Sequence, residues 1–170
     1  MSDAAAVEAS GRHEQVDELR KEALTMALYV AICLLAAMTA LPASEATHAK
    51  VIPLIWGVTV GLAVAHWFAF RVSARLVGAG RVRAHDVESA GAQLAGAAAV
   101  AVLASVPVAV LPASAELEAA ELLLAAFIAL VGYVVARGGR ARRSRALLYA
   151  ASVLVVAVAI AELKNRIAGH

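Results

Sequence analysis

Five apolar segments follow one another along this chain of 170 residues, separated by short polar stretches. A helix needs roughly 20 residues to cross a bilayer core about 30 Å thick, and each segment approaches that length. Because lipid offers no partner for backbone polar groups, only helices and closed barrels span a membrane. The pattern predicts an all-α bundle of five transmembrane helices over residues 22–41, 51–70, 92–111, 117–136 and 146–161.

The predicted membrane domain covers residues 22–170 and follows a polar cytoplasmic arm over residues 1–21. The arm is rich in acidic residues and has no apolar core, so it is not a signal peptide. The fourth segment carries Glu118 and Glu121 near its start and is short beyond them. A re-entrant or interfacial segment is the alternative to a full crossing here.

The composition supports a membrane protein. Hydrophobic residues make up 62% of the chain, charged residues 16%, and the mean hydropathy is +0.79. Soluble domains have about half apolar and about a quarter charged residues. The basic residues lie in short loops between apolar spans and form no continuous stripe, which argues against a nucleic-acid partner.

The basic residues also predict the orientation. Twelve of the fifteen Lys and Arg residues fall in the N-terminal arm and in the stretches after the second and fourth segments. Such loops stay in the cytoplasm. We therefore expect a multi-pass protein of the cell membrane with its N-terminus inside, its C-terminus outside and anionic lipid headgroups at its cytoplasmic face. The cluster after the fourth segment is a candidate docking site for lipid or an acidic partner: Arg137, Arg140, Arg142, Arg143 and Arg145.

A four-residue sequence occurs twice. Residues 41–44 and 111–114 both read Leu-Pro-Ala-Ser, and each copy ends an outward-going segment. Two helical hairpins in the same orientation plus a fifth helix would give this pattern, as in parallel membrane repeats. Coincidence in a chain dominated by small apolar residues is the alternative.

Small residues predict where the helices pack. Membrane helices associate through faces of small residues that let their backbones approach. The second segment has such a face at Gly57, Gly61 and Ala65, and the third has Ala92 and Gly96. We expect these two segments to pack together, within one chain or across a subunit boundary. The frequency of glycine in membrane helices is the plainer explanation.

Proline within the third segment predicts a kink. Pro107 removes one backbone hydrogen bond and crowds the carbonyl group of residue 103. Ser105 lies near enough to help satisfy the freed group. A gating role is one interpretation, and a merely tolerated kink is the other.

His66 is the main candidate functional residue, because an ionisable group within a span needs a partner. Thr59, His66 and Ser73 recur every seven residues and share one helix face, which predicts a polar path with His66 relaying protons. Alternatively, His66 makes a structural hydrogen bond to a neighbouring helix or lies beside Trp67 in an aromatic belt at the membrane interface. Thr25, Tyr29 and Cys33 form a second polar series, suited to hydrogen bonds between helices.

Enzyme chemistry has no support in the sequence. It lacks the H-E-x-x-H motif of intramembrane metalloproteases and the G-x-S-x-G motif that presents a nucleophilic serine. Its histidines are scattered and do not have the spacing of metal ligands. Cys33 is the single cysteine, so no intramolecular disulfide forms. We expect no catalytic residue, metal or cofactor. Since no span carries a carboxylate at its middle, a conduction path is expected to need an oligomer.

Two resemblances accompany these observations. The stretches GLAVAHWFAFRVSARL and LRKEALTMALYVAICLLAA resemble small uncharacterised actinobacterial membrane proteins, which implies no known activity. The last half, from PVAVLP through ALVGYVVARGGRARRSRALLYAASV, resembles the vacuolar iron transporter family. That resemblance implies five spans and dimeric proton/divalent-metal exchange. The family's acidic residue in the first span and Met and Glu in the second have no counterparts here, and its carboxylate-rich cytosolic bundle is reduced to residues 71–90. No site residue carries over.

Two hypotheses for function follow. The first is a small transport or permeation protein that acts as a homo-oligomer. The second is a non-enzymatic accessory or structural subunit of a membrane complex, which docks through its basic inner face and its small-residue faces. A hydrated cavity around His66 favours the first, and dry packing of His66 favours the second.

Overall fold

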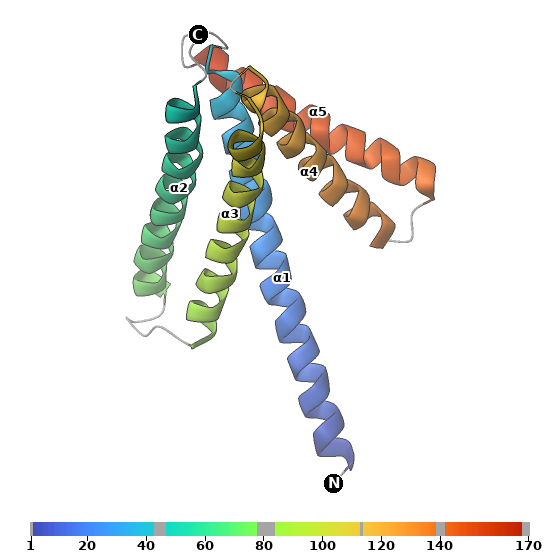
Figure 1. Cartoon of the computed structure of the whole chain (residues 1–170). Coiled ribbons are helices and arrows are strands. Elements are labelled where there is room, and N and C mark those ends of the chain that lie inside the picture. Colours follow the sequence, from blue (N-terminus) through green and yellow to red (C-terminus); the bar gives the residue numbers. More distant parts are fainter. Residues whose placement is uncertain (1, 43–46, 78–83, 113, 139–141, 168–170) are drawn as a thin grey trace.

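The computed structural model describes residues 2–42, 47–77, 84–112, 114–138 and 142–167. All regular secondary structure in these ranges is α-helical, which confirms the predicted fold class. The helices are α1 (Ser2–Thr39), α2 (His48–Val77), α3 (Ala84–Val110), α4 (Glu116–Gly138) and α5 (Arg143–Ile167) (Figure 1).

Four helices contain stretches that are long and apolar enough to cross a membrane. These stretches lie in α1, α2, α3 and α4 and cover Gly11–Thr39, His48–Ser73, Val87–Val110 and Glu116–Gly138. The stretches in α2 and α4 contain the second and fourth predicted segments. Those in α1 and α3 end one or two residues before the predicted ends of the first and third segments. The fifth predicted segment, residues 146–161, lies within α5. A crossing by α5 stays a prediction.

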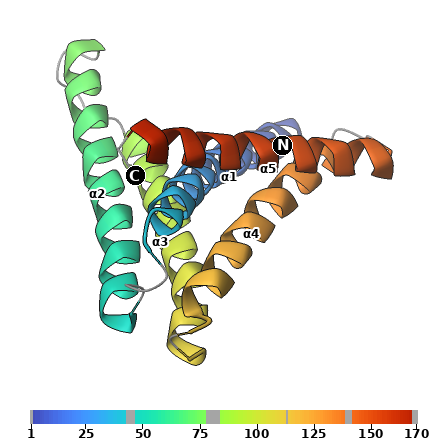
Figure 2. The ribbon, with the colours of Figure 1, turned by 90° about the horizontal axis from the view of Figure 1, so that it is seen from above.

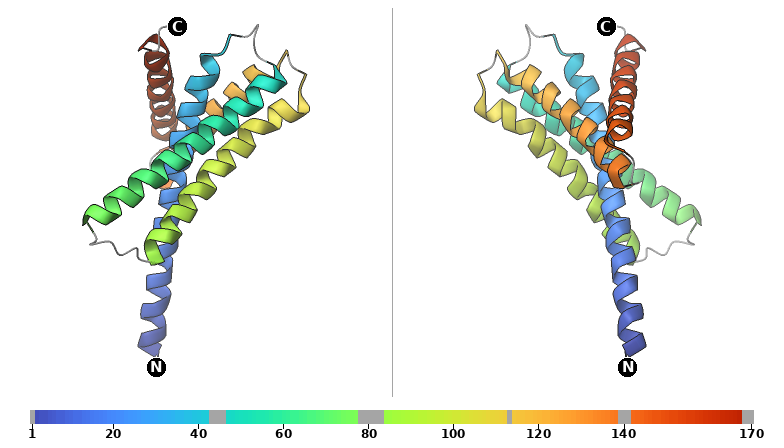
Figure 3. Two further views of the ribbon diagram at one scale, coloured as in Figure 1. Left: turned by 90° about the vertical axis from the view of Figure 1, so that its left-hand side faces the viewer. Right: turned by 90° about the vertical axis from the view of Figure 1, so that its right-hand side faces the viewer.

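The helix ends alternate in the way that a chain crossing back and forth requires. α1 ends, α2 begins, α3 ends, α4 begins and α5 ends at the same end of the bundle (Figure 1). Figure 3 shows the N-terminal end of α1 projecting from the opposite end. The end of α4 and the start of α5 point away from α2 and α3, whereas the start of α4 lies beside the end of α3 (Figure 2).

α1 is the central helix, since it packs against all four others. Its residues Val30, Ala31, Leu34 and Met38 are completely buried. The buried side chains of α4 recur every four residues, which gives that helix one inward stripe. Its members are Glu116, Ala120, Leu124, Ile128 and Gly132. The core is therefore built around α1, with much of α2 left exposed.

The predicted arm and first span form one continuous helix. α1 runs for 38 residues from Ser2 to Thr39, so no helix boundary falls at residue 21. The arm is rich in Ala, Glu, Arg and Lys, which favour helix. It is also held to α3, because Gln15 Nε2 donates a hydrogen bond of 2.6 Å to Glu88 Oε2.

Two prolines lie within helices. α2 begins at His48, three residues before the predicted start, so Pro53 lies in its second turn rather than its first. α3 continues through Pro107. Ser105 Oγ donates to the carbonyl group of Ala101 at 2.7 Å, one turn back in its own helix, and not to the carbonyl group of residue 103. A serine in a helix commonly makes this bond to the preceding turn.

The small residues of α2 and α3 have different surroundings. A side chain on Gly96 would meet the backbone of Ala23, so the close partner of Gly96 within the chain is α1 and not α2. Neighbouring Ala92 is half-buried. Gly57, Gly61 and Ala65 are exposed, and a Cβ on either glycine would meet nothing within 4 Å. Contact of this α2 face with another chain stays a prediction.

The two Leu-Pro-Ala-Ser copies occupy equivalent places. α1 ends at Thr39 and α3 at Val110, each just before its copy. The amide of Leu41 donates to Met38 and that of Leu111 to Pro107, both at 2.9 Å. Residues 43, 44 and 113 lie outside the described residues. A duplication of the two hairpins stays a hypothesis.

Candidate functional site: two cavities beside α1

A first cavity lies between α1, α2 and α3, towards the end at which α2 ends and α3 begins. Its volume is about 290 Å³. Three of the polar residues singled out in the sequence meet here: Thr25 and Tyr29 of α1 and His66 of α2. The full lining comprises Glu22, Thr25, Met26, Tyr29, His66 and Gln93. Polar side chains are rare in these helices, so their convergence makes this cavity a candidate site. We call it the inner cavity because it lies nearer the N-terminal end of α1.

A hydrogen bond across the helices anchors one wall of the inner cavity. Gln93 Nε2 of α3 donates to Glu22 Oε2 of α1. Gln93 Nε2 also lies 3.5 Å from Ser89 Oγ, one turn back in α3. Thr25 Oγ1 donates to the carbonyl group of Lys21 at 2.8 Å, which leaves its oxygen lone pairs as acceptors. The wall thus presents a carboxylate, an amide and a hydroxyl group.

Neither Glu22 nor Gln93 was predicted to have a role. Glu22 is the first residue of the first predicted segment. Gln93 and Ser105 are the polar side chains of the third predicted segment, and that rarity was the signal for Gln93.

The predicted stripe of α2 does not come together in one cavity. His66 is exposed and also lines a small gap of about 10 Å³ against α3, beside Trp67 and Leu94. Thr59 is buried and donates to the carbonyl group of Ile55 in its own helix at 2.8 Å. Ser73 is exposed. Of the three residues, only His66 lines the inner cavity.

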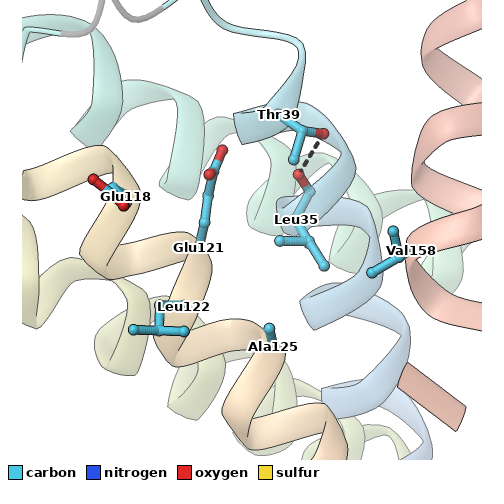
Figure 4. A pocket seen from close by; sticks show the side chains of 7 residues that line it. All are labelled: Leu35, Thr39, Glu118, Glu121, Leu122, Ala125 and Val158. Carbon is cyan, nitrogen blue, oxygen red and sulfur yellow. Dashed lines mark hydrogen bonds between the residues drawn. The ribbon is translucent and has the colours of Figure 1, made fainter. Parts of the chain in front are cut away.

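A second cavity of about 290 Å³ lies between α1, α4 and α5, nearer the other end of α1, and we call it the outer cavity. Its lining comprises Leu35, Thr39, Glu118, Glu121, Leu122, Ala125 and Val158. Figure 4 shows the Glu121 side chain extending from α4 into the space beside α1. Thr39 Oγ1 donates to the carbonyl group of Leu35 at 3.0 Å, the dashed line in Figure 4.

The two cavities are separated by a dry stretch of α1. The inner cavity uses α1 residues up to Tyr29, and the outer cavity begins at Leu35. Between them, Val30, Ala31 and Leu34 are completely buried. Both cavities carry carboxylate side chains, which attract cations.

A buried carboxylate joins α4 to α2 near the outer cavity. Glu116 is completely buried, and its Oε2 lies 2.8 Å from Nδ1 of His48. The side chain of His48 is 57% exposed. Glu116 Oε1 is buried without a hydrogen-bond partner. The sequence analysis assigned no role to either residue, although the four-residue spacing from Glu116 through Ala120 was a signal that it turns inward.

Cys33 is half-buried. Within the described ranges, no group of three or more His, Cys, Asp or Glu side chains is arranged to hold a metal ion.

Several of the described basic residues are exposed near helix ends. The Arg71 guanidinium is 5.0 Å from the centre of the Trp67 ring, a cation–π arrangement that suits the membrane interface. Arg137, Arg142, Arg143 and Arg145 are exposed at the end of α4 and the start of α5, while Arg140 lies outside the described residues.

Comparisons with protein-family models, with curated proteins and with solved structures gave no match for this chain.

Proposed function

We propose that this chain is a multi-pass protein of the cell membrane that transports or conducts a small solute as a homo-oligomer. The observation that carries the proposal is the pair of cavities at different heights along α1, each with glutamate and other polar residues in a mainly apolar lining. Polar and ionisable side chains within membrane helices mark solute and ion pathways. The carboxylates in both cavities favour a proton or another small cation.

The proposal includes five crossings, with the N-terminus inside and the C-terminus outside. The alternation of helix ends supports this topology (Figure 1). So does the charge distribution, since the arginine-rich stretches follow α2 and α4 and the acidic start of α4 lies at the other end.

The buried layer between the cavities requires either helix movement or a path between subunits. Val30 and Leu34, which lie between the two sets of α1 lining residues, are completely buried. The open face of α2 at Gly57 and Gly61 offers a surface for a second copy. A contact there places His66, from the same helix, near the boundary between the chains.

Flux through proteoliposomes tests the proposal. Purified protein is reconstituted, and proton and monovalent-cation uptake is measured under an imposed gradient. We expect His66→Ala to lower the uptake rate at least about tenfold, which corresponds to about 1.4 kcal/mol. Ser73→Ala is the matched control, because Ser73 lies on the same helix and outside the cavity lining. Unchanged uptake by His66→Ala removes His66 from the path.

A non-enzymatic accessory subunit is the second candidate. The exposed arginines at the α4–α5 end and the open glycine face of α2 favour it, because both suit a protein partner. Purification at native expression level distinguishes the two. A stoichiometric partner, together with no flux by the chain alone, supports the accessory role.

A further inference from the structure

The buried carboxylate of Glu116 imposes a proton requirement on the contact between α2 and α4. Removing an ionised carboxylate from water is costly unless a partner compensates its charge. The partner here is Nδ1 of His48, at 2.8 Å from Oε2. The second oxygen, Oε1, has no hydrogen-bond partner, so the imidazole is the main source of compensation.

The closed pair therefore holds one proton. If the proton is on the imidazole, an imidazolium faces a carboxylate. If it is on the carboxyl group, a neutral acid faces a neutral imidazole. Loss of the proton leaves a bare buried carboxylate beside a neutral ring, and this is the state that burial disfavours.

The open pair holds a different number of protons. In water, an imidazole releases its proton above about pH 6.5 and a carboxyl group releases its proton above about pH 4.3. Between these values the open and closed pairs hold equal numbers. Above about pH 6.5 the closed pair holds one more, so closure weakens as pH rises. Below about pH 4.3 the open pair holds two protons, and closure weakens again.

Other charged residues lie on the elements around this contact. α2 contributes Lys50, which is exposed. α4 contributes the exposed Glu118 and the half-buried Glu121, both in the other cavity wall. The last turns of α1 and α3 carry no ionisable residue, and α5 carries Glu162, Lys164 and Arg166 near its end.

We propose that His48 and Glu116 form a proton-dependent latch that holds the start of α2 to the start of α4. The latch is closed when the pair holds one proton and opens when that proton is lost. Because Glu116 begins the buried stripe of α4, opening exposes the end of the core beside Ala120. The latch stands on this geometry alone and does not depend on transport.

Spin-label distances test the latch. Labels are attached at Ala49→Cys and Ser114→Cys, two exposed positions flanking the pair, in a Cys33→Ala background reconstituted in nanodiscs. Electron paramagnetic resonance then gives the distance distribution from pH 5.5 to pH 9. We expect one short distance at pH 5.5. Above about pH 6.5, the ratio of short to long distances is expected to fall by up to about tenfold per pH unit.

Glu116→Gln removes the titrating carboxyl group and is expected to keep the short distance at every pH. Glu118→Gln is the matched control and is expected to keep the pH response. An unchanged distribution between pH 5.5 and pH 9 without these substitutions overturns the latch, and this result needs no folded Glu116 variant. A pH response that persists in Glu116→Gln, or is lost in Glu118→Gln, overturns it as well.

Discussion

Gly96 of α3 lies directly against the main-chain carbonyl group of Ala23 of α1, with no space for a side chain between them. The hydrogen bond from Gln93 to Glu22 lies about one turn away on α3 and at the adjacent residue on α1. A close backbone contact and a polar link thus hold α3 to the central helix at one level. Membrane helices use these two kinds of contact because lipid makes apolar burial a weak driving force.

Gly96→Ala is expected to destabilise the protein. Its Cβ would meet the backbone of Ala23 and not a flexible side chain, so α1 and α3 must separate. Overpacking of this kind costs about 1–3 kcal/mol. Thermal unfolding in detergent measures the loss as a lower melting temperature. Gly91→Ala in the same helix meets nothing within 4 Å and should leave the melting temperature nearly unchanged. Equal melting temperatures for the two variants would contradict the contact.

Gln93→Leu is expected to destabilise the protein more than Gln15→Leu. The first change leaves the half-buried Glu22 without its donor, and an unsatisfied polar group costs about 1–3 kcal/mol. The second breaks an exposed hydrogen bond to Glu88, for which water substitutes. Thermal unfolding of both variants gives the comparison. In Gln93→Leu, a further Glu22→Gln change should recover part of the loss. If it recovers none, Glu22 does not depend on Gln93.

Gly61→Leu is expected to reduce self-association without unfolding the chain. A side chain at Gly61 has open space within the monomer, so only a contact with a second chain can resist it. Native mass spectrometry of protein extracted in mild detergent measures the oligomeric state, and circular dichroism checks the helices. Val60→Leu, an exposed change next in sequence, is the control. An oligomer that tolerates leucine at this position does not use the α2 face.

The helices could be predicted because each is marked by an apolar run within its own stretch of sequence. A long apolar run has few alternatives to a helix, so the sequence was sufficient to identify α2, α3 and α4 to within several residues. The extent of α1 was not predicted. Charged residues in the arm lower its hydropathy, although Ala, Glu, Lys and Arg favour helix as strongly as the apolar residues do.

Contacts between helices were harder to predict, because a periodic pattern identifies a face and not its partner. Gly96 was predicted as a packing residue, and the backbone nearest to it within the chain belongs to α1. Thr25, Tyr29 and His66 were singled out because they stand out in apolar segments, but their meeting in one cavity was not predicted. Glu116 was overlooked because it precedes the fourth segment, where a carboxylate is ordinarily solvated. Its burial follows from the inward stripe of α4.

A reporter at each end of the chain is expected to report opposite sides of the membrane. Five crossings require this, and the crossing by α5 decides it, because four would return the C-terminus to the cytoplasm. The charges at the α4–α5 connection should hold it inside. Replacing Arg140, Arg142, Arg143 and Arg145 with glutamine is expected to lower the fraction of molecules with the C-terminal reporter outside. The Lys164→Gln and Arg166→Gln pair should not lower it. Both reporters on one side in the unmodified chain would show that α5 lies along the membrane instead of crossing it.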